Sequence, residues 1–102
     1  MQEIKLDPKY ADLVKSGRKT QTIRFGKRDY KLEPSQFKAG NEHISILITN
    51  VDFVPVRKLD VMDAKMDGFD SLNELTSALK KHYPHITENS WVTVISFDLK
   101  KY

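Results

Sequence analysis

Residues 91–99 read WVTVISFDL and alternate strictly between the two faces of an extended chain. The odd positions from Trp91 to Leu99 share one face, and the even positions, which include Ser96 and Asp98, share the other. A period of two predicts a half-buried β-strand, and it predicts that the ring of Trp91 packs in the core.

Residues 43–56 form the longest β-rich stretch of the chain and carry seven isoleucine, valine and phenylalanine side chains. Pro55 near the end of this stretch indicates an edge strand or a β-bulge, because proline cannot donate a ladder hydrogen bond. Residues 2–6 and 18–25 also read as strands. The polar residues 26–33 predict an exposed loop, and residues 37–40 predict a turn.

Helix signals separate these strands. Asp7 suits a helix N-cap and Pro8 the first helical position, and Gly17 is placed to end that helix. Residues 60–65 indicate a short helical turn. Residues 71–83 predict a longer helix, because they open with a serine and a glutamate at capping-box spacing and are followed by a proline. The apolar stripe of this helix comprises Leu72, Leu75, Leu79 and Tyr83. This order of elements predicts an α+β fold, a small, mostly antiparallel β-barrel with two or three helices packed outside.

Length and composition limit the class of protein. The 102 residues (11.8 kDa) predict a single domain over residues 1–102, and a hydrophobic content of 39% is enough for one core. The absence of cysteine excludes disulfides, thiolate nucleophiles and cysteine-ligated metals. The longest apolar run spans residues 46–48, and the first residues do not read as a signal peptide, so we expect a cytoplasmic protein.

Positive charge is concentrated in the first third of the chain. Residues 5–31 contain nine basic and three acidic residues, a net charge of +6, whereas the remainder has eight basic and eleven acidic residues, a net charge of −3. This asymmetry indicates either an anionic partner such as nucleic acid or simply a solvated basic surface.

No cofactor or metal motif is apparent in the sequence. The three histidines are His43, His82 and His85, and Pro84 breaks the helix on which the last two could share a face. There is no glycine-flanked serine and no phosphate-cradling glycine motif. We therefore expect neither a metal nor a cofactor.

Residues 17–24, which read GRKTQTIR, combine three cations and two hydroxyls directly after the first helix. In a strand whose Ile23 faces the core, Thr22 and Arg24 share the opposite face with Thr20. A neutral Lys19 could take the proton of the Thr22 hydroxyl, but the two converge only if the strand begins after Lys19 or carries a bulge. The alternative is that the threonines simply favour a strand and the cations face solvent.

These residues resemble a known family. The segment from Gly17 to Arg24, preceded by residues 10–16, resembles the opening motif of the ASCH (activating-signal-cointegrator homology) domain. Residues 67–69 (DGF), the following helix, Tyr83-Pro84 and the last strand resemble its second pattern, whereas residues 26–60 match no motif. The resemblance implies a PUA-like β-barrel, a superfamily of RNA-binding modules, with a cleft between residues 17–24 and the turn at Asp67.

The resemblance also implies an activity. One branch of short bacterial members hydrolyses N(4)-acetylcytidine to cytidine and acetate with a lysine, a threonine and a glutamate. The lysine matches Lys19 and the threonine matches Thr22, which implies a general base and a nucleophile. The glutamate falls near Asp67, one methylene shorter, with Asp70 as a nearby alternative. On this interpretation the aspartate orients or protonates the leaving amine.

Two other functions remain open from the sequence. The first is a non-catalytic module that binds single-stranded RNA rather than a modified nucleoside, with the aromatic ring of Tyr30 stacking on a base. The residues that would contact the nucleic acid or the substrate are Arg18, Thr20, Arg24, Lys27 and Arg28. The second is metal-independent RNA cleavage, which would use the same lysine and aspartate as acid and base.

Overall fold

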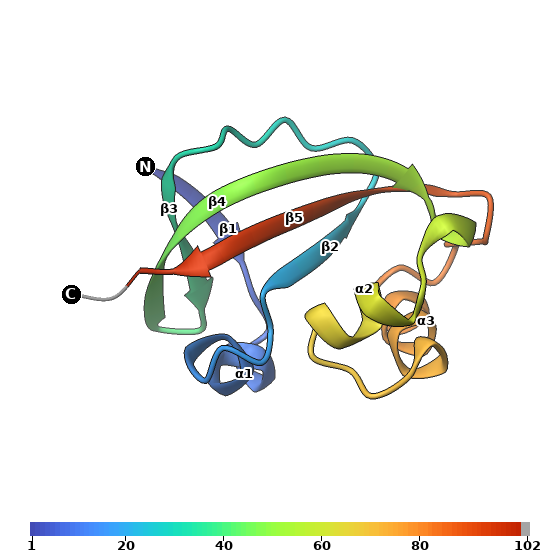
Figure 1. The fold of residues 1–102 in the computed structure, drawn as a ribbon, viewed down its shortest axis with the longest axis horizontal. Coiled ribbons are helices and arrows are strands. Elements are labelled where there is room, and N and C mark those ends of the chain that lie inside the picture. Colours follow the sequence, from blue (N-terminus) through green and yellow to red (C-terminus); the bar gives the residue numbers. More distant parts are fainter. Residues whose placement is uncertain (101–102) are drawn as a thin grey trace.

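The computed structural model describes residues 1–100, and Figure 1 shows their arrangement. One curved sheet forms most of the molecule, α1 lies against the ends of β1 and β2, and α2 and α3 lie together at one end. In chain order the elements are β1 (Gln2–Lys5), the 3-10 helix η1 (Pro8–Tyr10), α1 (Ala11–Lys15), β2 (Gln21–Phe25), β3 (Pro34–Ala39), β4 (Glu42–Pro55), the 3-10 helix η2 (Val56–Lys58), α2 (Val61–Met66), α3 (Leu72–His82) and β5 (Trp91–Leu99).

The five strands form one sheet in the order β1-β3-β4-β5-β2. Every neighbouring pair is antiparallel except β1 and β3, which run parallel with Gln2 opposite Ser35. A register shift between Ile48 and Asn50 marks an irregularity in β4. The sheet curls into a half-barrel with β1 and β2 as its edges, which confirms the α+β barrel fold predicted from the order of elements.

Strand β3 was not predicted. The sequence indicated a loop up to residue 33 and a turn at residues 37–40, whereas the chain is extended over Pro34–Ala39 and turns at Gly40, where φ is +63°. Ser35, Phe37 and Ala39 are buried, but polar or charged residues alternate with them. Their short apolar pattern was therefore too weak to indicate a strand.

Strand β5 is where predicted, but it is not half-buried. Four consecutive residues, Val92 to Ile95, are buried, because one face lines the barrel interior and the other packs against the helices at the end of the sheet. The prediction that Trp91 packs in the core is wrong: its side chain is 47% exposed and stacks on Phe53, with ring centroids 5.0 Å apart.

Two apolar clusters fill these two sides of the sheet. The barrel interior contains Phe37 and Phe97, whose rings meet edge to face with centroids 4.9 Å apart. The second cluster joins the outer face of β2 and β5 to the helices. Of the predicted stripe on α3, Leu75 and Leu79 are buried in this cluster, Tyr83 is half-buried and Leu72 is exposed.

Side-chain caps define the helix starts. Asp7 accepts a hydrogen bond from the backbone N–H of Lys9 at 3.1 Å, and Ser71 accepts one from that of Glu74 at 3.2 Å, as the sequence predicted. Within residues 1–100, no helix combines the length and the apolar character needed to cross a membrane.

Candidate functional site

A cavity of about 720 Å³ lies where the β1–η1 segment, β2, the α2–α3 turn and α3 meet. Lys19, Thr22, Arg24 and Asp67 all line this cavity. Its volume falls in the range of pockets that enclose small molecules. The structure thus brings the lysine, the threonine and the aspartate singled out in the sequence to one pocket, as the cleft implied by the motifs requires.

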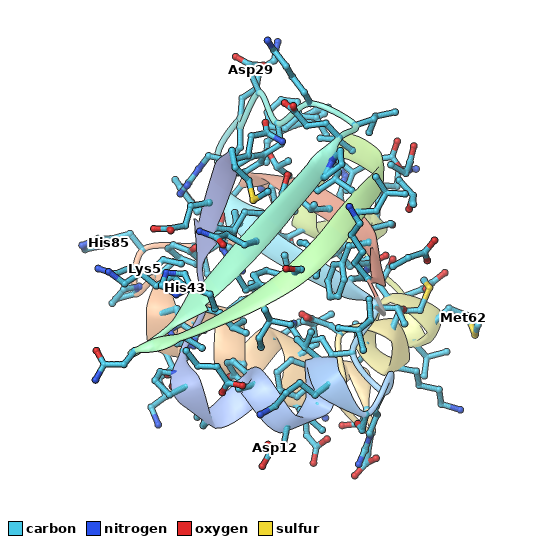
Figure 2. All side chains as sticks on the ribbon, turned by 90° about the vertical axis from the view of Figure 1, so that its left-hand side faces the viewer. Lys5, Asp12, Asp29, His43, Met62 and His85 are labelled. Carbon is cyan, nitrogen blue, oxygen red and sulfur yellow. The ribbon has the colours of Figure 1, made fainter. Side chains whose placement is uncertain are left out.

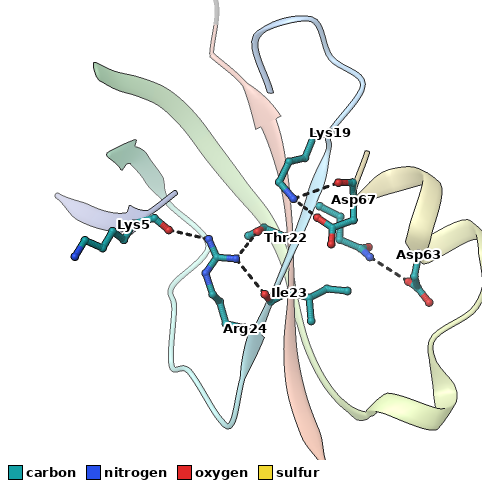
Figure 3. Close-up of polar contacts among 8 residues, drawn as sticks. Lys5, Lys19, Thr22, Ile23, Arg24, Asp63 and Asp67 are labelled. Carbon is teal, nitrogen blue, oxygen red and sulfur yellow. Dashed lines mark hydrogen bonds and ion pairs between the residues drawn. The ribbon is translucent and has the colours of Figure 1, made fainter. Parts of the chain in front are cut away.

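Lys19 and Asp67 form a buried ion pair at this pocket (Figure 3). Their side chains are only 4% and 6% exposed, and the Lys19 Nζ also approaches the backbone carbonyl of Asp67 at 3.4 Å. Strand β2 begins at Gln21, so Lys19 precedes it and does not follow its alternation. This is the condition under which Lys19 and Thr22 face the same space. Asp67, not Asp70, is the carboxylate that meets the lysine.

Burial shifts both members of the pair toward their neutral forms. Desolvation lowers the pKa of the Lys19 ammonium, an effect that pairing with Asp67 opposes and nearby Arg24 adds to. Desolvation raises the pKa of the Asp67 carboxyl, and the same pairing opposes that shift. A proton that moves from the lysine to the aspartate leaves a neutral amine beside a carboxylic acid, which are a general base and a general acid.

Arg24 holds the Thr22 hydroxyl and also closes the barrel. Its Nη1 donates to Thr22 Oγ1 at 2.6 Å and to the Ile23 carbonyl at 3.0 Å, and its Nη2 donates to the Lys5 carbonyl at 2.8 Å. The guanidinium thereby bridges β2 and β1, the two edges of the half-barrel (Figure 3). Because a guanidinium can only donate, the Thr22 oxygen acts as acceptor and keeps its own proton for another acceptor.

Aromatic rings form the wall next to the ion pair. The Lys19 Nζ lies 5.5 Å from the centroid of the Tyr10 ring, which meets Phe69 edge to face at 6.1 Å. Burial raises the pKa of the Tyr10 hydroxyl, and Asp7 and Asp67 add to this shift. An uncharged tyrosine and a phenylalanine suit a flat, apolar part of a ligand.

Gly68 sets the turn that presents Asp67. Its φ is +91°, and a Cβ at this position would lie 3.1 Å from Leu13 Cδ1. Gly68→Ala should therefore lower the free energy of unfolding by about 1–3 kcal/mol because of backbone strain. The close approach of the new Cβ to Leu13 should add to this loss. Gly17→Ala is the matched control, since φ is +82° there and nothing lies within 4 Å of the added Cβ. Urea unfolding that showed equal losses for both variants would contradict a special role for this turn.

Five of the residues predicted to bind substrate or RNA do not line the pocket, although Arg24 does. Arg18 is exposed and forms an ion pair with Asp70, and Thr20 is exposed with its backbone N–H bonded to the Met66 carbonyl at 2.7 Å. Lys27 and Arg28 lie in the loop after β2, where the Arg28 backbone N–H donates to Thr93 Oγ1 at 2.9 Å.

The aromatic residue predicted to stack on a base has a different environment. Tyr30 was chosen because no packing partner was evident, but its ring is half-buried against the barrel cluster. The exposed aromatic pair is Phe53 and Trp91, which are 41% and 47% exposed. The sequence analysis therefore expected Tyr30 to be exposed and Trp91 to be buried, whereas the structure shows the reverse.

Sequence reasoning also missed several residues that line the pocket. Tyr10 entered the sequence analysis only as part of the segment that precedes the Gly17–Arg24 motif, and Lys5 and Lys38 reach the pocket only because β1 pairs with β3. That non-local, parallel pairing leaves no pattern within either segment. Among residues 1–100, no three histidine, cysteine, aspartate or glutamate side chains are grouped so that they could hold a metal ion.

Comparison with known proteins gives relatives by structure only. No family model matches the sequence, and no curated protein gives a significant match. An ASCH domain from Lactobacillus crispatus JV V101 superposes with a TM-score of 0.76 at 16% identity, covering 96% of this chain and 79% of that one.

Two further solved structures share this architecture. Protein EF3133 from Enterococcus faecalis V583, of family DUF984, has a TM-score of 0.74 at 19% identity, covering 97% of this chain and 80% of that one. The hypothetical protein PH0355 has a TM-score of 0.74 at 15% identity, covering 97% and 98% of the two chains. The fold implied by the motifs around Lys19 and Asp67 is therefore the one that this chain adopts, the fold of an ASCH domain.

Proposed function

We propose that this pocket hydrolyses the amide of an N-acylated cytosine nucleoside, converting N(4)-acetylcytidine to cytidine and acetate. The observation that carries the proposal is the buried Lys19–Asp67 pair in the same cavity as Thr22. A buried ion pair is weak evidence that the two residues stabilise the fold, because removing the charges from water costs free energy. Buried ionisable pairs with shifted pKa values are, however, frequent among catalytic acids and bases.

The proposed reaction begins with proton transfer from the Lys19 ammonium to the Asp67 carboxylate. The neutral amine then takes the Thr22 hydroxyl proton while Oγ1 attacks the acetyl carbonyl. Arg24, which donates to this oxygen at 2.6 Å, stabilises the negative charge that develops on it. When the carbon–nitrogen bond breaks, the Asp67 carboxyl protonates the leaving cytosine nitrogen, and the ion pair is restored.

Water completes the proposed cycle. After Lys19 has again passed its proton to Asp67, the water attacks the acetyl ester on Thr22 and gives one proton to the Lys19 amine. Thr22 Oγ1 takes the proton of the Asp67 carboxyl as acetic acid leaves, and the ion pair is restored once more. The net reaction consumes one amide and one water and yields one amine and one carboxylic acid. The volume of the cavity and the Tyr10–Phe69 wall support a planar base as the part of the substrate that is enclosed.

The direct test is chromatography of N(4)-acetylcytidine incubated with the protein, with Ala78→Phe and Ser77→Phe in parallel. Ala78 lines the pocket from α3, whereas its neighbour Ser77 is exposed and does not line it. We expect the wild type and the Ser77 variant to release cytidine and acetate in equal amounts, and the Ala78 variant to lose this activity because phenylalanine fills the cavity. No release by folded wild type would refute the proposal.

RNA binding is a second candidate, favoured by the exposed Phe53–Trp91 stack. The loop carrying Lys27 and Arg28 adjoins this pair, since the Gly26 backbone N–H donates to the Trp91 carbonyl at 2.9 Å. Exposed rings beside cations suit single-stranded nucleic acid. This surface does not line the pocket, so Trp91→Ala would weaken RNA binding and leave nucleoside hydrolysis unchanged. RNA cleavage would again require Lys19 and Asp67.

A further inference from the structure

Two lysines lie side by side at one end of the pocket. Lys5 on β1 and Lys38 on β3 are register partners in the parallel pair, and both line the cavity. Among residues 1–100 they form the only register pair of like charges in the sheet. Adjacent strands lie about 4.8 Å apart, so the two side chains leave the same face of the sheet next to each other and place two positive charges at this edge of the pocket.

No carboxylate in residues 1–100 pairs directly with either ammonium. Within the described residues, neither ammonium forms an ion pair or a hydrogen bond. The nearest acids to Lys5 along the chain have other partners: Glu3 accepts from Gln36 at 3.0 Å and lies 3.7 Å from His43 Nε2, and Asp7 caps η1. Neighbouring cations that have no direct ionic partner at a pocket edge are poised to receive an anion.

The position of the lysines relative to Thr22 indicates which part of a ligand they would meet. The Arg24 guanidinium links the Lys5 carbonyl to the Thr22 hydroxyl, because it donates a hydrogen bond to each of them. Figure 3 shows that the Lys5 ammonium extends away from Arg24 and from the Lys19–Asp67 pair. In Figure 2 it lies on the same side of the molecule as His43, the register partner of Lys38 on β4. An anion bound there sits at the end of the pocket remote from the ion pair.

We propose that Lys5 and Lys38 bind the phosphate of a nucleoside 5′-monophosphate, so that the pocket takes an N-acylated cytidine 5′-phosphate in preference to the free nucleoside. In such a molecule the 5′-phosphate and the acylated nitrogen lie at opposite ends, as the lysines and the Lys19–Asp67 pair do in the pocket. The orientation of the base rests on the proposed hydrolase, whereas the preference for phosphate does not.

Calorimetric titration with cytidine 5′-monophosphate and with cytidine tests this proposal without any reaction. We expect the monophosphate to bind the wild type at least tenfold more tightly than cytidine. Lys5→Gln and Lys38→Gln should each remove most of that difference and leave cytidine binding unchanged. Lys31→Gln is the matched control, because it removes the same charge from an exposed position outside the pocket lining.

Three results would overturn the phosphate site. These are equal binding of the two ligands, a phosphate preference that survives both pocket variants, and tighter binding of an oligocytidylate without a terminal phosphate. Hydrolysis of N(4)-acetylcytidine without a preference for the 5′-phosphate would contradict the phosphate site and leave the proposed reaction standing. A lysine-dependent preference for cytidine 5′-monophosphate over cytidine, with no hydrolysis of the acylated nucleoside or of its 5′-phosphate, would contradict the proposed reaction and leave the phosphate site standing.

Discussion

Thr22→Val should reduce kcat/KM for N(4)-acetylcytidine by about 1,000-fold or more, because it removes the only atom that the proposed mechanism uses to attack the amide. Valine keeps the volume and the β-branch of threonine, and it suits the centre of a strand. The residue is 1% exposed, so a substitution of similar size is needed to leave the packing intact. Chromatographic rates and circular dichroism of the same samples measure activity and fold together.

Thr22→Ser is the matched variant for this experiment. It retains the hydroxyl that accepts from Arg24 and should retain a substantial part of the activity, while it loses a buried methyl group and with it some stability. The hydroxyl rather than the packing is responsible if the serine variant is active but less stable than the valine variant. A valine variant with nearly wild-type rates would show that Thr22 is not the nucleophile.

The sequence predicted the residues inside the pocket better than the residues expected to bind ligand around it. Lys19, Thr22 and Asp67 belong to two short motifs far apart in the chain, and the pocket unites them. Such motifs are visible because each local turn needs particular residue types. Gly68, whose φ is +91°, is an example, since few other residues adopt that conformation.

What the sequence could not predict depends on non-local pairing. The parallel contact of β1 with β3 places Lys38 beside Lys5, and no periodicity within either segment indicates it. Trp91 was misplaced for a related reason. Alternation indicates which residues of a strand share a face. Whether other side chains cover that face depends on how far the residue lies from the end of the curled sheet. Trp91 begins β5 at the rim, so its side of the strand is exposed there.

Lys19→Met and Asp67→Asn should each lower the free energy of unfolding by about 3–5 kcal/mol, because each leaves a buried charge without its partner. The double variant should recover most of this loss, since neither charge is then left in the pocket. Urea unfolding of all four proteins gives the coupling free energy. Single variants that are as stable as the wild type would show that the pair is solvated in solution.

The two single variants should depend on pH with opposite signs. In Lys19→Met, burial still raises the pKa of Asp67 but the lysine no longer opposes it, so the folded state holds this proton more tightly than the unfolded state. Stability is then greatest below the pKa of the unfolded chain, about 3.9, and falls as the pH rises through the folded value.

In Asp67→Asn, burial lowers the pKa of Lys19 without the opposing carboxylate, so the folded state binds fewer protons than the unfolded state. Stability then rises with pH until the unfolded lysine also loses its proton, at a slope of up to about 1.4 kcal/mol per pH unit. The stability of each single variant is measured by urea unfolding and compared with that of the double variant at the same pH. Opposite slopes of these two differences would establish that each charge is buried even when its partner is absent. Parallel slopes would mean that the pocket hydrates whichever charge remains, and a hydrated lysine would be protonated at neutral pH and unable to act as the base.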